Sequence, residues 1–181
     1  MKKTILIVLL LISVQASAQN TSKSYINKFK DDAIRIMHQS GIPASIILAI
    51  AMHESGCGSS DIAKNLNNQF GMKGSNIVVY KKRRKKVSTM YKQYESVGES
   101  FEDFARVITE RKKFIGLANH FTHYDYFGWV HGIQKAGYAS SRKWEAQVLA
   151  LISKYNLNNF DEKPDATLTQ FSLASAPDNV E

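Results

Sequence analysis

Glu54 is the acidic residue whose neighbours best suit acid–base chemistry. It ends the apolar run ASIILAIAMHE (44–54) and is followed by Ser55-Gly56 and then Gly58. A glutamate in such a place is more often a hydrated or ion-paired structural residue, so its surroundings decide the interpretation. A carboxyl held among apolar helix faces resists ionisation, so its pKa rises and it keeps a proton for a leaving oxygen. The serine and the glycines turn the chain sharply, which leaves space beside the carboxyl for a bulky substrate.

Several predicted helices position this glutamate. Apolar residues recur at helical spacing over 23–38, and Gly41 ends that helix. Pro43 suits the first turn of the next helix, which is apolar nearly all round and is therefore predicted to lie buried, with Glu54 near its C-terminal end. Further helices are predicted at 59–66 with Ser59 or Ser60 as the cap, from the Ser96 and Glu99 capping box to 113, at 125–135 with Asp125 as the cap, and at 141–155.

One hairpin is the only sheet that the sequence predicts. Ile77 to Tyr80 and Val87 to Tyr94 are rich in β-branched and aromatic residues, and they flank the run KKRRKK at 81–86. The predicted fold class is therefore α+β and mostly α, a helical body with a small β-hairpin lobe. The basic run is either a solvated hairpin tip or a surface that attracts anionic polymers.

The first 18 residues have the layout of a secretory signal peptide. Lys2 and Lys3 precede an apolar run over 5–14, and Ala16-Ser17-Ala18 forms a small-residue cleavage site. The apolar run is shorter than the roughly 20 residues of a membrane-spanning helix. The pattern predicts export to the periplasm or out of the cell, and a mature chain that begins at Gln19.

Charge is distributed unevenly along the chain. The whole chain carries +8 and residues 160–181 carry −4; because Lys2 and Lys3 lie in the predicted signal peptide, residues 19–159 carry +10. Such a basic body favours a polyanionic partner, and outside the cytoplasm an anionic wall polymer or a membrane surface is favoured over nucleic acid.

Residues 160–181 lack apolar periodicity and are predicted to be a disordered acidic tail. Residues 19–159 are then one catalytic domain, expected to be a monomer.

Metal and thiol chemistry are weaker interpretations. His53-Glu54 lacks a second histidine four residues after the first, and the spacing of His120 and His123 is a weak signal, so no metal and no cofactor are predicted. Cys57, the only cysteine, follows a helix C-terminus, whereas a nucleophilic thiol usually needs a helix N-terminus or a cationic neighbour. A cysteine peptidase is disfavoured, and no disulfide can form within the chain.

The segment 42–74, IPASIILAIAMHESGCGSSDIAKNLNNQFGMKG, resembles the glucosaminidase domain of peptidoglycan hydrolases. Members of that family typically have an apolar helix that ends in Glu-Ser-Gly-Trp-Gly, followed by Asn-Asn-x-Phe-Gly and Lys-Gly. YKQYESVGESFEDFARVI (91–108) and AGYASSRKW (136–144) resemble later parts of the family pattern. The likeness covers nearly all of residues 22–155 in the right order.

This resemblance implies a lysozyme-like fold with a groove for a glycan strand. It also implies cleavage of the β-1,4 bond after N-acetylglucosamine in the peptidoglycan of the cell wall. The family's general acid falls on Glu54, and the tyrosine of its Gly-Tyr-Ala motif falls on Tyr138. The residues predicted to bind the substrate are Asn68, Phe70, Tyr94 and Ser140, of which the two aromatic residues are candidates for stacking on sugars.

Two departures from the family pattern bear on the mechanism. Cys57 stands where the family usually has tryptophan, and no Asp or Glu lies between Asp61 and Glu95, so the hairpin cannot supply the second carboxylate that many members place there. In some glycosidase families the acetamido group of the substrate attacks the anomeric carbon instead. That route is favoured here, with Tyr138 orienting or stabilising the intermediate. The alternatives are a water activated by Asp61 or Asp125, an intramolecular transglycosylation, muramidase action and a non-catalytic wall-binding module.

Overall fold

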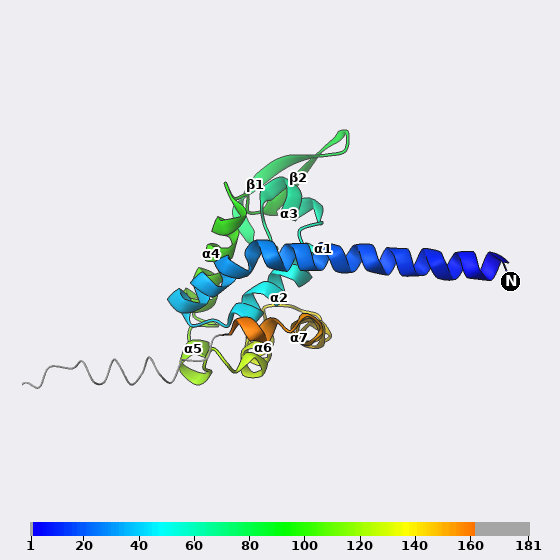
Figure 1. Cartoon of the computed structure of the whole chain (residues 1–181). Helices are drawn as coiled ribbons and strands as arrows, with labels where there is room; N and C mark the ends of the chain where they lie inside the picture. Colours follow the sequence, from blue (N-terminus) through cyan, green and yellow to red (C-terminus); the bar gives the residue numbers. More distant parts are fainter. Residues whose placement is uncertain (1, 162–181) are drawn as a thin grey trace, which may run out of the picture.

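Residues 2–161 are described by the computed structural model, and most of them are helical (Figure 1). Within this range the sheet is one antiparallel hairpin, so the predicted α+β, mostly α, class is confirmed. In chain order the elements are α1 (Lys2–Ser40), α2 (Ala44–Ser55), α3 (Asp61–Leu66), β1 (Lys73–Lys82), β2 (Lys85–Tyr91), α4 (Val97–Glu110), α5 (Leu117–His120), α6 (Tyr126–Lys135), α7 (Trp144–Tyr155) and the 3-10 helix η1 (Leu157–Phe160).

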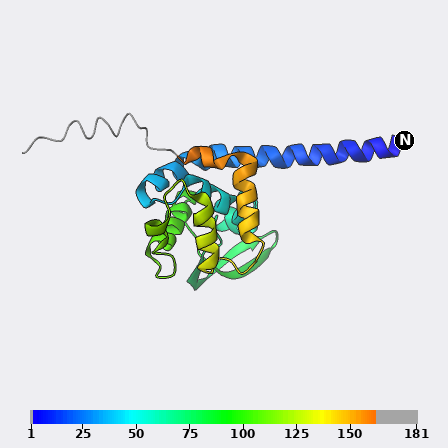
Figure 2. The same ribbon diagram turned by 90° about the horizontal axis from the view of Figure 1, so that it is seen from below.

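Helix α2 forms the centre of the hydrophobic core. Its residues from Ala44 to Met52 are all buried, as expected for a run that is apolar on every side. Helices α1, α4, α6 and α7 and η1 all contact it, and Figure 2 shows α6 and α7 lying side by side against the body. Because α2 is enclosed along its length, the place where its C-terminal residues emerge is fixed by packing.

Helix α1 is longer than the predicted 23–38, because it begins at Lys2. Its C-terminal part packs on α2, whereas its N-terminal part, which holds the predicted signal peptide, projects from the body in Figures 1 and 2. Gly41 ends the helix as predicted, with a φ of 74° and its N–H donating to the Met37 carbonyl at 2.8 Å. None of the described helices is both long and apolar enough to cross a membrane.

Three helices begin at the caps that the sequence predicted. In each, a side-chain oxygen of the cap accepts a backbone N–H of the first turn. The cap bonds join Ser60 Oγ to Ala63 N (3.1 Å) in α3, Ser96 Oγ to Glu99 N (3.1 Å) in α4, and Asp125 Oδ1 to Gly128 N (2.9 Å) in α6.

Other helices differ from the prediction. Helix α7 begins three residues later than predicted, and the short helices α5 and η1 were not predicted.

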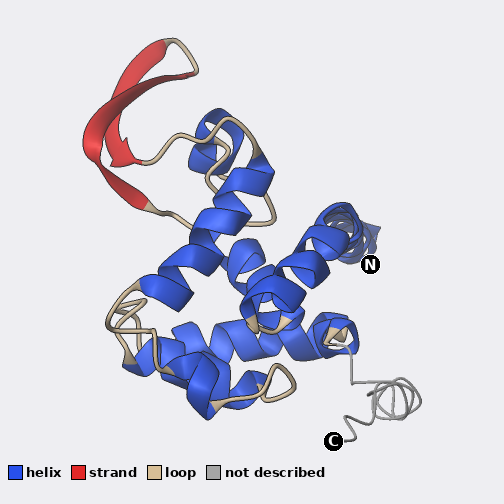
Figure 3. Cartoon of the chain, turned by 90° about the vertical axis from the view of Figure 1, so that its left-hand side faces the viewer, coloured by secondary structure: helices blue, strands red, loops and turns tan. Residues whose placement is uncertain are grey.

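Strands β1 and β2 form a curved hairpin that stands away from the helical body (Figure 3). The register pairs Val79 with Ser88 and Lys81 with Lys86, and it is irregular between Lys73 and Val78. β1 begins before the predicted Ile77, and the basic run forms the tip, as predicted. The hairpin therefore presents the cations at the end of a lobe.

The folded body extends two residues past the boundary predicted at residue 159. Phe160 ends η1, and the Asp161 side chain is buried. Asp161 accepts hydrogen bonds from Ser45 N at 2.8 Å and from Ser45 Oγ at 2.6 Å, so it caps the N-terminus of α2, whose own cap residue Pro43 has no side-chain oxygen to offer. The rest of the predicted acidic tail, 162–181, lies outside the described residues.

Candidate active site

Glu54 is held at the C-terminal end of α2 by a tight local turn. Gly56 has a φ of 58°, in the left-handed region that glycine adopts without strain, and its N–H donates to the Met52 carbonyl. Ser55 Oγ donates to the Ala51 carbonyl at 2.6 Å and accepts from Gly58 N at 2.7 Å. The chain therefore leaves the helix axis immediately after Glu54, as the sequence predicted.

The Glu54 carboxylate is oriented by a residue 90 positions away. Trp144 Nε1 donates to Glu54 Oε1 at 2.8 Å, and His53 Nδ1 lies 3.2 Å from the same oxygen. Among the described residues, Oε2 has no hydrogen-bond partner. The Glu54 side chain is 26% exposed, so the expectation of a carboxyl enclosed by apolar helix faces is met only on one side. One oxygen is thus fixed by the protein, and the other is available to a substrate.

A cleft of about 450 Å³ opens beside this carboxylate. Of the described residues that line it, Glu54 is the only acidic one, whereas Lys73, Arg111 and Lys113 bring three positive charges. The lining residues come from the end of α2, the loop before β1, the end of α4 with the segment after it, and the loop between α6 and α7. They are His53, Glu54, Phe70, Gly71, Met72, Lys73, Val107, Arg111, Lys113, Phe114, Tyr138, Ala139, Ser140, Ser141 and Trp144.

Tyr138 lies in the same cleft, packed against the tryptophan that orients Glu54. The centroids of the Tyr138 and Trp144 rings are 5.4 Å apart, and the Tyr138 hydroxyl donates to the Phe70 carbonyl at 3.3 Å. Burial raises the pKa of Tyr138 well above its usual 10.0, and the negative charge of Glu54 raises it further. The phenol therefore stays protonated at neutral pH and acts as a hydrogen-bond donor.

Ser140 and Phe70 line the cleft in different ways. Ser140 is exposed on the loop between α6 and α7, where its hydroxyl is accessible, so substrate binding by Ser140 stays a prediction. Phe70 is 3% exposed, and its ring stacks on Phe104 with centroids 4.3 Å apart. The ring of Phe70 thus belongs to the aromatic core, which argues against its predicted stacking on a sugar. Its backbone carbonyl instead holds Tyr138.

Asn68 holds together the two ends of the hairpin. Its side chain is 1% exposed: Nδ2 donates to the Met72 and Lys92 carbonyls, both at 2.9 Å, and Oδ1 accepts from Met72 N at 3.0 Å. This burial leaves little surface for the predicted direct contact with a glycan. Asn68 acts by positioning the segment that carries Gly71, Met72 and Lys73 into the cleft.

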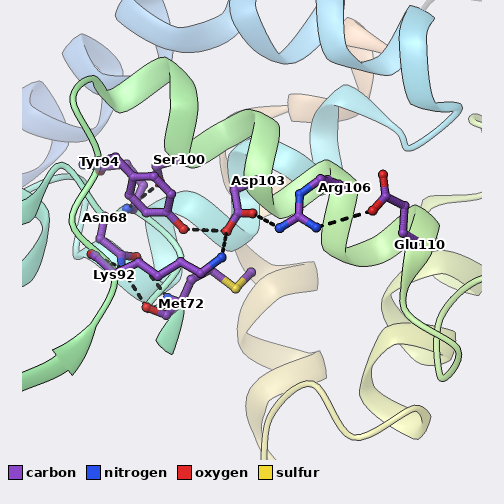
Figure 4. A network of polar contacts seen from close by, with 9 residues as sticks. Asn68, Met72, Lys92, Tyr94, Ser100, Asp103, Arg106 and Glu110 are labelled. Carbon is purple, nitrogen blue, oxygen red and sulfur yellow. Dashed lines mark hydrogen bonds and ion pairs between the residues drawn. The ribbon is translucent and has the colours of Figure 1, made fainter. Parts of the chain in front are cut away.

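Tyr94 belongs to a polar network on α4 (Figure 4). Its hydroxyl donates to Asp103 Oδ2 at 2.6 Å, and the same oxygen receives Lys92 Nζ at 2.8 Å, while Arg106 bonds the other oxygen. Burial opposes ionisation of Asp103, but these hydrogen bonds outweigh it and lower its pKa. Tyr94 is partly buried and does not line the 450 Å³ cleft, so its predicted contact with substrate would need a groove that continues along α4.

The two acidic residues considered as alternative bases lie elsewhere. Asp61 pairs with Lys82 of the hairpin at 2.6 Å, and Asp125 caps α6. Neither lines the cleft. Cys57, the residue that replaces the family's tryptophan, contacts α1: its Sγ is 3.4 Å from Ser22 Oγ.

Sequence reasoning missed the residues that complete the site. Trp144 lay within a motif that carries the family resemblance, yet nothing local showed that its N–H reaches Glu54. Lys73 lay in the Lys-Gly part of the motif and Arg111 and Lys113 lay in none, and nothing local showed that these three cations share the cleft with Glu54. Lys73, the pair Arg111 and Lys113, and Trp144 come from three separate parts of the chain. Only a prediction of which distant segments pack together could have found them.

The helical body with its small hairpin, and a carboxylate beside a cleft, match the lysozyme-like fold and groove that the motifs predicted. A model of the glucosaminidase family, described as mannosyl-glycoprotein endo-beta-N-acetylglucosaminidase, matches residues 30–157. This match covers most of the chain, so the chain belongs to the glucosaminidase family, which confirms the resemblance inferred from its motifs.

Two curated relatives agree with this membership. The chain is 23% identical to the peptidoglycan hydrolase FlgJ of Vibrio cholerae over 91% of its own length and 53% of the relative's, and 25% identical to the exo-glucosaminidase LytG of Bacillus subtilis over 83% and 57%. It thus spans little more than half the length of these relatives.

Two solved domains share its fold. The catalytic domain of the autolysin Auto from Listeria monocytogenes superposes with a TM-score of 0.64 at 22% identity, covering 77% of this chain and 87% of that domain. The glycoside hydrolase domain of Salmonella typhimurium FlgJ gives 0.60 at 21%, covering 84% and 96%.

Proposed function

We propose that this chain is an exported peptidoglycan hydrolase that cleaves the β-1,4 bond after N-acetylglucosamine, with Glu54 as the general acid. The observation that carries the proposal is the arrangement of the Glu54 carboxylate. Oε1 accepts Trp144 Nε1 at 2.8 Å, while Oε2 has no partner among the described residues and lies beside the cleft. A proton on Oε2 is therefore placed for transfer to a leaving glycosidic oxygen.

The substrate itself supplies the nucleophile in this proposal. Because Glu54 is the only acid among the described residues that line the cleft, the acetamido oxygen of N-acetylglucosamine attacks the anomeric carbon while the glycosidic C–O bond breaks and the leaving oxygen takes the proton of Glu54. Water then opens the cyclic oxazolinium, and its proton returns to Glu54. The protonated phenol of Tyr138 turns its single O–H from the Phe70 carbonyl to the substrate, where the new hydrogen bond orients the acetamido group or stabilises the cyclic intermediate.

The charge of the cleft suits the glycan of a cell wall. Peptidoglycan carries carboxylates on its lactyl-linked peptide stems, whereas a chitin strand is neutral. Lys73, Arg111 and Lys113 line the cleft together with Glu54, the one acid of its described lining, so attraction to an anionic strand is expected and is weakened by salt. The relatives FlgJ and LytG bear the names of a peptidoglycan hydrolase and an exo-glucosaminidase, in line with this substrate.

Mass spectrometry of digested wall tests which bond is cut, and proton NMR during the first turnovers tests the chemistry through the configuration of the new end. The expected product has a reducing N-acetylglucosamine end with β configuration at the first instant, and a thiazoline analogue of the cyclised intermediate inhibits the reaction. An inverted α-anomer would exclude the acetamido route. A reducing muramic acid end would identify a muramidase instead.

A lytic transglycosylase is the second candidate, because the missing second carboxylate suits an intramolecular attack as well. Its product would be an anhydro sugar, which differs from the hydrolysis product by one water. A zymogram on purified wall separates both activities from a non-catalytic binding module, which would give no clearing.

Export rests on the layout of residues 1–18. We expect the protein recovered outside the cytoplasm to begin at Gln19, and N-terminal sequencing of that material checks it. Recovery of the chain from the cytoplasm with Met1 retained would contradict export.

A further inference from the structure

The hairpin exposes a row of apolar side chains on one face. Side chains alternate between the two faces of a strand, so Ile77 and Val79 share a face of β1. Val79 pairs with Ser88, and Met90 follows two residues later on that same face. Ile77 is 70% exposed, Val79 55% and Met90 45%, whereas Val78 and Tyr80 on the opposite face are partly buried.

This gathering is unusual for the described part of the molecule. Single exposed apolar residues are normal on any protein surface, but neighbouring ones mark an interaction site. Among residues 21–161, whose side chains the structure describes, five large hydrophobic residues are exposed; three lie on this hairpin face, and the other two are Ile115 and Phe127.

The same face ends in positive charge. Lys81 and Lys86 pair across the strands next to Val79 and Ser88. Of the six cations in the run 81–86, only Lys82 forms an ion pair within the described residues, with Asp61 at 2.6 Å. The other five form no ion pair within residues 21–161, so their positive charge can attract an anionic surface. Figure 3 shows that the hairpin reaches outward from the helical body, in agreement with the exposure of Ile77, Val79 and Met90.

We propose that the outer face of the hairpin, Ile77, Val79, Met90, Lys81 and Lys86, binds the surface of an anionic phospholipid membrane. A soluble anionic polymer offers only charge and leaves the three apolar side chains in water. A membrane offers both charge and an apolar phase directly beneath it, and basic residues beside apolar ones are the pattern of interfacial binding. Lipid binding stands independently of the proposed glycosidase activity.

Membrane binding would place the cleft near the membrane. The segment Gly71 to Lys73 lines the cleft and leads directly into β1. A hairpin held on a lipid surface would keep Glu54 close to the layer of glycan nearest that surface.

Co-sedimentation with vesicles tests the proposal. The protein is purified from the cell that makes it, so that every variant has the same natural N-terminus. Vesicles of phosphatidylglycerol mixed equally with phosphatidylcholine are compared with vesicles of phosphatidylcholine alone, and with soluble polyphosphate as an anionic polymer. We expect binding to the anionic vesicles and no measurable binding to the neutral ones.

Two sets of variants separate the apolar and the charged contributions. Replacing Ile77, Val79 and Met90 by Ser is expected to weaken vesicle binding at least tenfold and to leave polyphosphate binding unchanged. The matched control is the double variant Ile115→Ser, Phe127→Ser, which changes exposed apolar residues elsewhere and should bind vesicles normally. Replacing Lys81 and Lys86 by Gln is expected to weaken vesicle binding about 25-fold at low salt, from about fivefold for each cation. Its control replaces Lys112 and Lys135 by Gln.

Three results would overturn the proposal. One is unchanged vesicle binding by the Ser triple variant, and another is equal loss in the matched control. The third is a protein that sediments as a dimer and becomes a monomer in the Ser variant, because a second copy would then cover the face. Should the triple variant melt below the wild type, the single substitution Ile77→Ser at the most exposed position takes its place and must still weaken vesicle binding.

Discussion

The cleft and the hairpin are built in different ways. Glu54 receives its hydrogen bond from Trp144, which is buried on another helix, and the Tyr138 phenol is held by the carbonyl of Phe70. The hairpin is held by pairing between neighbouring strands and is joined to the body by Asn68 and Asp103. Acid–base chemistry needs groups fixed by long-range packing, whereas surface attraction needs only charges that are adjacent along the chain. Mutations should therefore affect turnover in one region and binding in the other.

The largest expected effect is that of Glu54→Gln. Glutamine keeps the shape of the side chain and still accepts from Trp144, but it cannot give up a proton, so turnover on purified wall should fall about 10²- to 10⁴-fold. The melting temperature and wall binding should match the wild type. The control is Glu110→Gln, which removes a carboxylate from an exposed position on α4. A folded Glu54→Gln protein with near-normal turnover would contradict the assignment of the acid.

Trp144→Phe is expected to lower turnover by about tenfold. The variant keeps most of the buried ring but loses the N–H that orients Glu54, and a hydrogen bond to a charged group contributes about 1.5–3 kcal/mol. Trp129→Phe is the matched control, because Trp129 is equally buried but donates to the Thr122 carbonyl, away from the cleft. Similar melting temperatures with a turnover loss only in Trp144→Phe are expected, and equal losses in both would refute an orienting role.

Asp161→Ala should destabilise the body without changing its chemistry. It removes both hydrogen bonds to Ser45 at the N-terminus of α2, and loss of such a cap costs about 1–2 kcal/mol. Denaturant unfolding measures the loss, and turnover per folded molecule should be unchanged. A chain ending at Asp161 should unfold like the full chain, whereas one ending at Asn159 should lose at least as much stability as Asp161→Ala. Equal stability of the two shortened chains would show that the body ends at residue 159.

The smallest expected effect is the pH dependence of stability at Asp103, where the hairpin is joined to α4 through Lys92. Folding lowers the pKa of Asp103 below its ordinary 3.8, so the folded protein binds fewer protons at this site than the unfolded chain does. The stability from this site is then fully present above about pH 4 and is lost as the pH falls through the lowered pKa. Hydrogen exchange of β1 and β2 between pH 2 and 6 follows this loss. Asp103→Asn should abolish that pH dependence, and an unchanged profile in the variant would assign it to another group.

Much of the fold could be predicted because its signals are local. The Ser60, Ser96 and Asp125 caps, the end of α1 at Gly41 and the basic hairpin tip all depend on residues within one or two turns of each other. The position of Glu54 at the end of a buried helix follows from an apolar run and the glycines after it, and the motifs around it were sufficient to predict the family.

Only the tertiary structure decided which side chains meet. The bond from Trp144 to Glu54, the cap that Asp161 gives to Ser45 and the three cations of the cleft join segments far apart in the chain, whose distances no local pattern encodes. For the same reason Phe70 and Asn68, predicted as ligand contacts from their motif, lie buried. A motif specifies which residue is present, whereas packing against distant helices determines whether that residue faces the cleft or the core.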